Sequence, residues 1–375
     1  MKPLPFACLL AAVMTPAARA DTLNDRIERA VERGVQALRA LQEKGGGGAI
    51  GRAGEGINDM GRTALVGLTL LECGVAGDDA LVRKIADSVR EQSVEANRVY
   101  NLSLGILLFD RLGDERDIPL IQAMAVRLME GQFKEGGWSY TTPSPDDKEV
   151  QRLKSLIQKR TELRAGGSGT PKPDGPPPLD PDLADRLKRF QERGPGEHQA
   201  QLQNNPLGNL IGVPDNSNTQ FAIMGLWAAR HHGIPADPAL QRCEAYFRAS
   251  VTVVPITGAI GPVRFHATWP YTATADPSGR AAMTCAGLMG LAIGTGVVRD
   301  RQLKTVPDPA AKKPPTLRDP LNDPIVQGGL NYVAEQLVKA VSEGAQGVQL
   351  DYYFIWSVER VAVTYSESFA RVRPT

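Results

Sequence analysis

Apolar residues along the chain follow a helical period and fall into two kinds of segment. Segments 22–44 and 81–89 have apolar residues every three or four positions, which predicts amphipathic helices. Segments 63–73 and 102–112 are apolar on almost every side, which predicts helices buried all round. No segment alternates with a period of two, so few strands are expected. Two layers of helices, with the buried kind inside the amphipathic kind, satisfy both patterns.

The apolar helices also repeat a phrase. Thr63, Thr219 and Thr284 each begin an apolar run that has a glycine in its middle and a glycine where it closes, and a looser fourth copy lies around residues 104–106. A glycine inside a helix costs about 1 kcal/mol relative to alanine, so its recurrence indicates that helices approach closely there. The closing glycines predict left-handed C-caps. The central glycines are Gly67, Gly225 and Gly290, and the closing glycines are Gly74, Gly113, Gly233 and Gly296.

A second phrase, rich in glycine and aromatic residues, follows the amphipathic helices. It is clearest from Gly131 to Tyr140, and Trp269-Pro270-Tyr271 is a shorter copy. Residues 141–214 interrupt the scheme with a Pro/Gly-rich linker at 165–178 between charged helical patterns, so we expect a surface insertion. The predicted organisation is therefore N-terminal repeats over 21–140, a flexible, charged insertion over 141–214 and C-terminal repeats over 215–375.

The first twenty residues have the pattern of a secretory signal peptide. Lys2 precedes an apolar stretch at 5–14, and Ala18-Arg19-Ala20 forms a small-x-small cleavage site. We expect cleavage after Ala20 and export to the periplasm or out of the cell. The apolar stretch is too short to span a bilayer, and no later segment has about 18 uninterrupted apolar residues, so no membrane span is expected.

Charge and cysteine content narrow the functional classes further. Lysine plus arginine is 43 and aspartate plus glutamate is 42, so charge indicates neither a nucleic-acid surface nor an anionic-membrane patch. Cys73, Cys243 and Cys285 remain after cleavage, and an odd number excludes complete pairing within the chain. Their apolar or helical surroundings predict buried free thiols.

These phrases resemble known families. The pattern Gln132-x3-Gly136-x-Trp138 is similar to the glutamine–tryptophan repeat of squalene and oxidosqualene cyclases, and segments 215–222, 283–288 and 351–360 resemble exported bacterial proteins with prenyltransferase/squalene-oxidase repeats. The resemblance implies an all-α fold, an α/α toroid of inner and outer helices. It also implies that Gln132, Gly136, Trp138 and Trp269 tie repeats together. The last helix pair of those proteins has no counterpart here, so the expected ring is incomplete or is closed by one last helix.

The sequence lacks the catalytic motifs of these families. The Asp-x-Asp-Asp acid motif of the cyclases and the Asp/Cys/His zinc set of the prenyltransferases are not recognisable, so we expect no metal and no cofactor. Four residues remain candidates for a central cavity, although each has an ordinary structural explanation. Helix capping explains Asp215 and Asp351, loop packing explains His266, and an ion pair with Arg360 explains Glu359.

The sequence therefore favours a non-catalytic, exported toroid that binds a ligand or a protein partner in the cell envelope. The alternative is an enzyme that uses the central cavity, either a terpenoid cyclase-like isomerase or a polysaccharide-active lyase or hydrolase. The sequence leaves open the identity of the ligand, the oligomeric state and whether the ring closes.

Overall fold

The computed structural model describes residues 22–44, 59–166, 178–204, 212–256, 265–272, 280–304, 320–347 and 349–369. These residues form thirteen α-helices and a single two-stranded sheet, so the prediction of a helical fold is confirmed. The expected signal peptide at 1–20, Gly45–Gly48, most of the linker at 165–178 and the loop at 306–319 lie outside the described residues.

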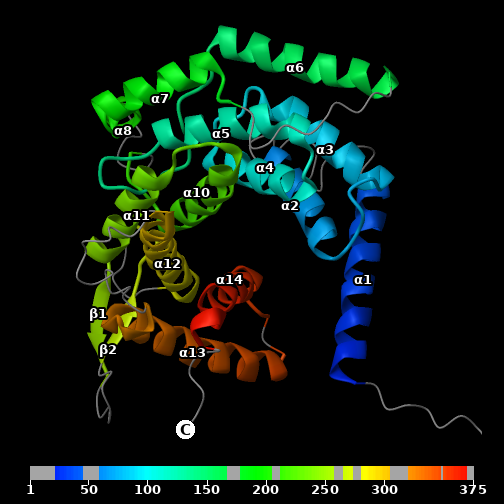
Figure 1. Cartoon of the computed structure of the whole chain (residues 1–375). Helices are drawn as coiled ribbons and strands as arrows, with labels where there is room; N and C mark the ends of the chain where they lie inside the picture. The colour runs from blue at the N-terminus through cyan, green and yellow to red at the C-terminus, as the bar shows by residue number, and fades with distance from the viewer. Residues whose placement is uncertain are drawn as a thin grey trace, which may run out of the picture. The chain divides into compact units, whose positions relative to one another are not determined.

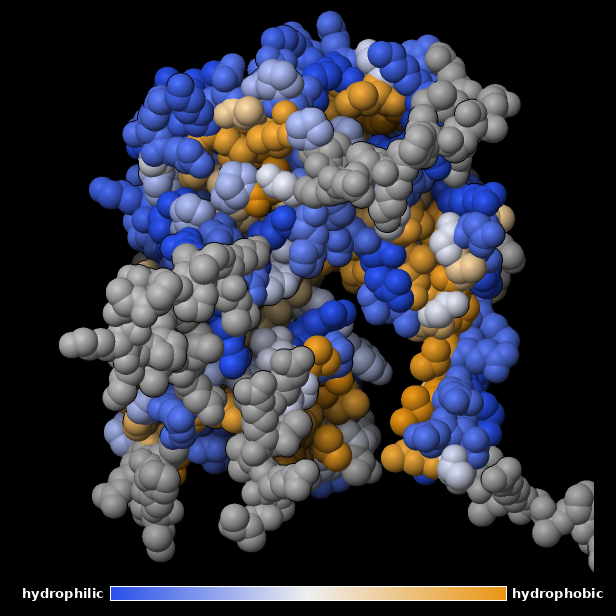
Figure 2. Space-filling model, in the orientation of Figure 1, coloured by the Kyte–Doolittle hydropathy of each residue, from blue (hydrophilic) through white to orange (hydrophobic). Residues whose placement is uncertain are grey.

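Helix α1 (Leu23–Lys44) belongs to one compact unit, residues 1–47, and the other helices belong to a second, residues 48–375. Thr22 and Asp25 cap α1 reciprocally, since each backbone N–H donates to the other side chain, at 2.8 and 3.2 Å. The apolar positions of α1 form a stripe along one side, which Figure 2 shows as an orange band. Four of them are exposed: Leu23, Ile27, Val31 and Leu41.

Five apolar helices form a continuous row in the second unit, here called the apolar row (Figure 1). Each member packs on the next, and their order in space is their order in the chain. They are α2 (Asp59–Glu72), α4 (Val99–Leu112), α10 (Asn216–Ala229), α12 (Ala281–Lys304) and α14 (Tyr352–Phe369). Within the described residues no comparable packing joins α14 back to α2.

Four helices alternate with the apolar row along the chain and pack against it. Helix α3 (Ala80–Ser93) contacts α2 and α4, α5 (Ile118–Glu130) contacts α4 and α10, and α11 (Asp237–Ala249) contacts α10 and α12. Helix α13 (Pro324–Ala345) packs on α12 and on β2 (Phe265–Thr268), which pairs antiparallel with β1 (Thr252–Pro255). Row helices and covering helices therefore alternate along the chain, although the covering helix α5 is apolar and buried along almost its whole length instead of amphipathic.

The predicted insertion contains α6 (Asp147–Gly166), α7 (Pro181–Arg193) and α8 (Glu197–Gln203). Helix α6 contacts α3, and α7 contacts α5. Buried ion pairs also anchor the insertion helices. Arg160 of α6 reaches Asp117 at 2.8 Å, Glu149 of α6 reaches Arg127 of α5 at 3.1 Å, and Arg186 of α7 binds Glu130. Because breaking such a buried pair leaves a charge uncompensated, these contacts hold the insertion helices against the covering layer.

The aromatic phrase forms the same junction twice. The indole N–H of Trp138 donates to the carbonyl of Leu128 at 2.6 Å, and that of Trp269 donates to the carbonyl of Phe247 at 2.8 Å. Both acceptors lie two residues before the end of a covering helix, α5 or α11. The backbone N–H of each tryptophan donates to the hydroxyl of a threonine in the first turn of the next apolar helix. Trp138 donates to Thr219 at 3.0 Å, and Trp269 donates to Thr284 at 3.4 Å. Both indoles are fully buried, so the repeat exists in three dimensions as well as in sequence.

Gln132 links the first junction to the next covering helix. Its amide donates to the carbonyls of Gly136 and Ala239 at 2.9 and 2.8 Å, and its oxygen accepts from Arg242 Nε at 2.9 Å. Gly136 has φ +106°, and a Cβ there would lie 2.3 Å from the Arg242 carbonyl oxygen. Only glycine fits this turn, because it tolerates both the positive φ and the close approach.

Three of the four closing glycines behave as predicted. Gly74, Gly113 and Gly233 have φ between +70° and +83°, as a left-handed C-cap requires. The prediction for Gly296 is wrong, because α12 continues through it to Lys304. Buried thiols are found at Cys243 and Cys285, but the prediction is wrong for Cys73, which is exposed just after α2.

One described helix, α12, has the length and composition to cross a membrane, over Ala281–Arg301. Two-thirds of that apolar window is buried inside the protein, as in the core helix of a globular domain.

Candidate functional site

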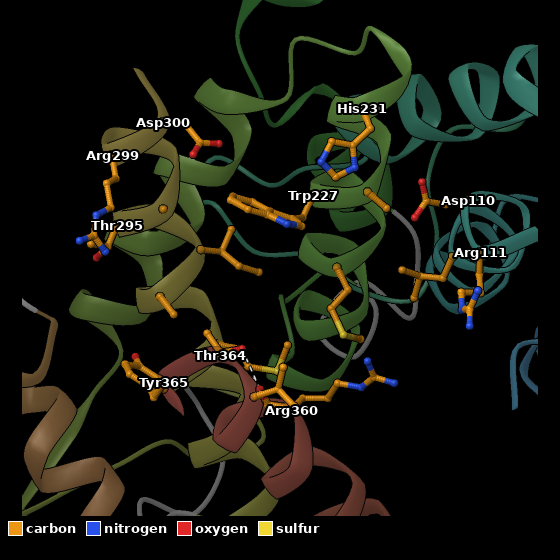
Figure 3. Close-up of a pocket in the computed structure, with 18 of the residues that line it drawn as sticks. Asp110, Arg111, Trp227, His231, Thr295, Arg299, Asp300, Arg360, Thr364 and Tyr365 are labelled. Carbon is orange, nitrogen blue, oxygen red and sulfur yellow. Dashed lines mark hydrogen bonds between the residues drawn. The ribbon is translucent and has the colours of Figure 1, made fainter. Parts of the chain in front are cut away.

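A cavity of about 730 Å³ lies among all five helices of the apolar row. Its volume is in the range of small-molecule sites, which run from about 300 to 1,000 Å³. Most of its wall is apolar, and Figure 3 shows its polar side chains gathered around that wall. The main apolar side chains are Leu68, Leu107, Met224, Trp227, Met289, Ile293, Trp356 and Val363.

The helices of the row contribute to the cavity in a similar way. In four of them a lining residue is followed four positions later by a charged residue on the same helix face, and after α10 the corresponding residue, His231, lies in the 3-10 helix η2 (Arg230–His232). The five pairs are Leu68/Glu72, Leu107/Arg111, Trp227/His231, Thr295/Arg299 and Trp356/Arg360. The result is an apolar wall with a charged rim, here called the rim.

Trp227 projects from α10 towards α12 (Figure 3). The guanidinium of Arg230 lies 4.5 Å from its ring centroid and is itself held by Asp237 and Asp300 at 2.8 and 2.9 Å. On the α12 side, a Cβ at Gly296 would lie 3.0 Å from the edge of the ring. Gly296 therefore leaves room for the indole, which explains a glycine within a helix where no cap forms.

Trp356 is the second aromatic wall residue, and stacked rings support it. Its ring lies 5.3 Å from that of Phe221 and 6.1 Å from that of Tyr353, at interplanar angles of 9° and 21°. The Arg360 guanidinium lies 5.5 Å from its centroid. Stacked geometry of this kind fixes a ring in place at little entropic cost, so the wall is preformed.

Hydrogen bonds extend this support to the N-terminal ends of α4, α10 and α14. The hydroxyl of Tyr353 donates to Gln220 Oε1 and contacts Ser217 Oγ, both at 2.8 Å, and Ser217 also bonds the hydroxyl of Tyr100. Burial raises the pKa of Tyr100 to about 12, so this phenol stays protonated at neutral pH. The network joins three helices of the row directly beneath the aromatic stack.

Two ion pairs and one histidine–carboxylate contact hold several charged side chains at the cavity. Arg111 pairs with Glu72 at 3.2 Å, Asp110 meets His232 at 2.8 Å, and Arg360 pairs with the neighbouring Glu359 at 3.1 Å. Arg299 forms no ion pair with any residue in the described part of the chain. The rim can therefore solvate a polar group of a ligand while the wall covers its apolar part.

None of the four candidate residues predicted from the sequence lines this cavity. Asp215 is 1% exposed and caps α10, since both its carboxylate oxygens accept from Asn218, at 2.7 and 2.8 Å. Burial raises its pKa to about 6, although the bonds from Asn218 oppose the shift. Asp351 caps α14 by accepting from the N–H of Phe354 at 3.1 Å.

The other two candidates contact charged side chains. Glu359 is half exposed and meets Arg360, and His266 lies on β2, where its Nε2 is 3.1 Å from Glu335 Oε1 and its ring faces Tyr332. No hydrogen bond or ion pair joins any two of the four candidates, all of which are described residues. The described residues also contain no group of three His, Cys, Asp or Glu side chains that could hold a metal ion.

The cavity was not predicted from the sequence, although its two tryptophans indicate it. Trp227 and Trp356 lie in apolar helices, and each is followed four residues later by a basic residue, His231 or Arg360. An aromatic residue that shares a helix face with a basic one indicates a face that is not part of a dry core. No family model matches the chain, and neither a curated protein nor a solved structure does.

Proposed function

We propose that this protein is an exported helical toroid of the squalene-cyclase-like kind that binds an apolar or amphiphilic ligand among its inner helices without converting it. Support for the architecture comes from the two layers and from the junction that Trp138 and Trp269 repeat. Support for export comes from the pattern of the first twenty residues.

The observation that carries the binding proposal is the apolar cavity of about 730 Å³ with two tryptophans in its wall, one of them held in a ring stack. A ligand that buries about 300 Å² of apolar surface there would gain roughly 7 kcal/mol before the cost of association is subtracted. The rim places charged groups where the polar end of an amphiphile would meet solvent.

The same cavity gives less support to catalysis. A cyclase needs a protonated acid against its substrate, and the buried acid with a raised pKa, Asp215, does not line the cavity. The acids that do line it, Glu72, Asp110 and Asp300, each contact a basic side chain. Binding without conversion is therefore the function that this geometry favours.

A pair of substitutions on α12 tests the proposal. Ala292 lines the cavity, whereas Val298 is exposed on the same helix and does not, so A292W fills the cavity and V298W is the matched control. The probe is N-phenyl-1-naphthylamine, a neutral apolar dye whose emission rises in an apolar site. We expect native protein and V298W to bind one dye per chain with similar affinity. We expect A292W, at unchanged thermal stability, to bind it about tenfold more weakly or worse, because the added ring occupies the site.

Equal binding by A292W and native protein would show that the dye binds elsewhere and would contradict the proposal. Mass spectrometry of a bound ligand after long incubation separates binding from catalysis. Recovery of the ligand unchanged is expected, and a stoichiometric or greater yield of an isomer or cleavage product would establish the enzymatic alternative.

A further inference from the structure

A second, smaller pocket of about 230 Å³ lies between the insertion and the covering layer, apart from the cavity of the apolar row. Its walls come from α7, from α8 and from the end of α5, and its lining is rich in basic side chains. The residues that matter for its chemistry are Glu130, Arg186, Arg189, Arg193, Glu197 and His198.

His198 forms the buried end of this pocket. It is 7% exposed, and its Nε2 lies 3.0 Å from the backbone carbonyl oxygen of Thr141. A carbonyl can only accept, so Nε2 carries a hydrogen, and in the neutral ring Nδ1 does not. Among the described residues none meets strict hydrogen-bond geometry with the buried Nδ1, although the side chain of Gln201 lies close enough to oppose the lowering of the ring's pKa. A buried polar atom left unpaired is costly, so Nδ1 is a position where a polar group of a ligand would be favourable.

The arginines of the pocket differ in how strongly ion pairs engage them. Arg186 binds Glu130 and Glu149 at close range, so its charge is already used. Arg193 meets Glu197 only at 3.4 Å, and both side chains are mostly exposed, so this pair contributes little. Arg189, one helical turn before Arg193, forms no ion pair with any described residue. Arg189 and Arg193, four residues apart, lie on the same face of α7 and line the pocket together with His198.

We propose that this pocket is a binding site for a small oxyanion, a carboxylate or a phosphate. Arg189 and Arg193 hold its charge, and one oxygen accepts a hydrogen bond from Nδ1 of His198. Guanidinium groups suit this ligand because their planar donors match carboxylate and phosphate oxygens. The site is independent of the apolar cavity, so the failure of one proposal would leave the other unaffected.

Occupation of the site is coupled to a proton. Burial lowers the pKa of His198, which favours the neutral ring in the empty pocket. The charged groups that face the pocket are Glu130 from α5, Arg186, Arg189 and Arg193 from α7, and Glu197 from α8 itself. An anion beside Nδ1 adds a negative charge and raises the pKa of the ring, so the ring takes up a proton as the anion binds. Affinity must therefore rise as pH falls through the titration of His198.

Titration of the full-length chain with sulfate and with formate tests the site. Both ions keep one charge state between about pH 5 and 8, so any pH dependence belongs to the protein. Sulfate stands in for a phosphate and formate for a carboxylate, and the two arms show which the site prefers. Ring chemical shifts follow the four histidines, and loss of one resonance in H198Q assigns His198. We expect saturable sulfate binding that raises the pKa of His198 alone and is about tenfold tighter near pH 5.5 than near pH 7.5.

Two variants distinguish the site from general ionic effects. R189A/R193A should bind sulfate about tenfold more weakly, whereas R83A, which removes an exposed arginine from α3, should bind like native protein. H198Q should lose the pH dependence of binding. If H198Q does not fold, R189A/R193A still tests the site, because both of its substitutions are on the exposed surface of α7. A His198 titration that neither anion moves, or equal binding by R189A/R193A and native protein, would overturn the proposal.

Discussion

The four tryptophans of the chain occupy two kinds of position. Trp138 and Trp269 are fully buried, and each donates its indole N–H to the end of a covering helix. Trp227 and Trp356 line the cavity. The first pair could be predicted, because a glycine-rich phrase repeats around it. The second pair lies within apolar helices that look like core, and only the basic residue four positions later distinguishes it.

Asp215 gives a prediction at this scale because its folded-state pKa is about 6, against an ordinary value of 3.8. The folded protein then holds this proton more tightly than the unfolded chain does. Stability should therefore fall as pH rises from about 4 to about 6, by up to about 3 kcal/mol from this residue. Asparagine can still cap α10 but cannot ionise, so D215N should remove this part of the pH dependence.

Urea unfolding at several pH values measures the difference in slope between native protein and D215N. D351N is the matched control, because it changes a capping aspartate that is exposed at the start of α14. Its slope should stay close to that of the native protein. Parallel slopes for native protein and D215N between about pH 4 and 6 would show that Asp215 is not buried as described.

Glycines show what the sequence can and cannot determine about a whole helix. The closing phrases at Gly74, Gly113, Gly233 and Gly296 look alike, yet only the first three end a helix. Local sequence fixes the backbone freedom of a glycine, but the use of that freedom depends on its neighbour. At Gly296 the neighbour is the ring of Trp227, which comes from another helix about seventy residues earlier in the chain.

The same change, glycine to alanine, should have opposite effects in two helices. At Gly225 in α10 a Cβ would lie 3.1 Å from the Cα of Ser103 in α4, so G225A pushes two backbones apart and should cost about 1–3 kcal/mol. At Gly34 in α1 nothing lies within 4 Å of the added Cβ. G34A should therefore strengthen that helix by up to about 1 kcal/mol.

Chemical denaturation gives the unfolding free energy of G225A, and helix content by circular dichroism follows G34A. A stable G225A would mean that α4 and α10 do not approach as closely as their contacts indicate. A loss of helix in G34A would likewise contradict the open surroundings of that glycine.

At the scale of the second unit, the alternation of row helices with covering helices follows the alternation of apolar and amphipathic segments, except at α5, which is apolar throughout. That alternation is a local property, so the sequence displays it. The cavity is different, because it arises from five helices that span residues 59–369 and from which of their faces meet. The predicted acids, such as Asp215 and Glu359, were found by residue type, and their positions at helix ends or in ion pairs could not be known before the packing was known.

Tryptophan quenching by a brominated fatty acid, dibromostearate, tests the central claim most directly. Bromine quenches an indole only at close range, and the chain offers two tryptophans in the cavity wall and two in buried junctions. We predict saturable quenching of the native protein and almost none in W227F/W356F, which keeps Trp138 and Trp269. Quenching that persists in the double variant, or native protein that is not quenched at all, would contradict the account.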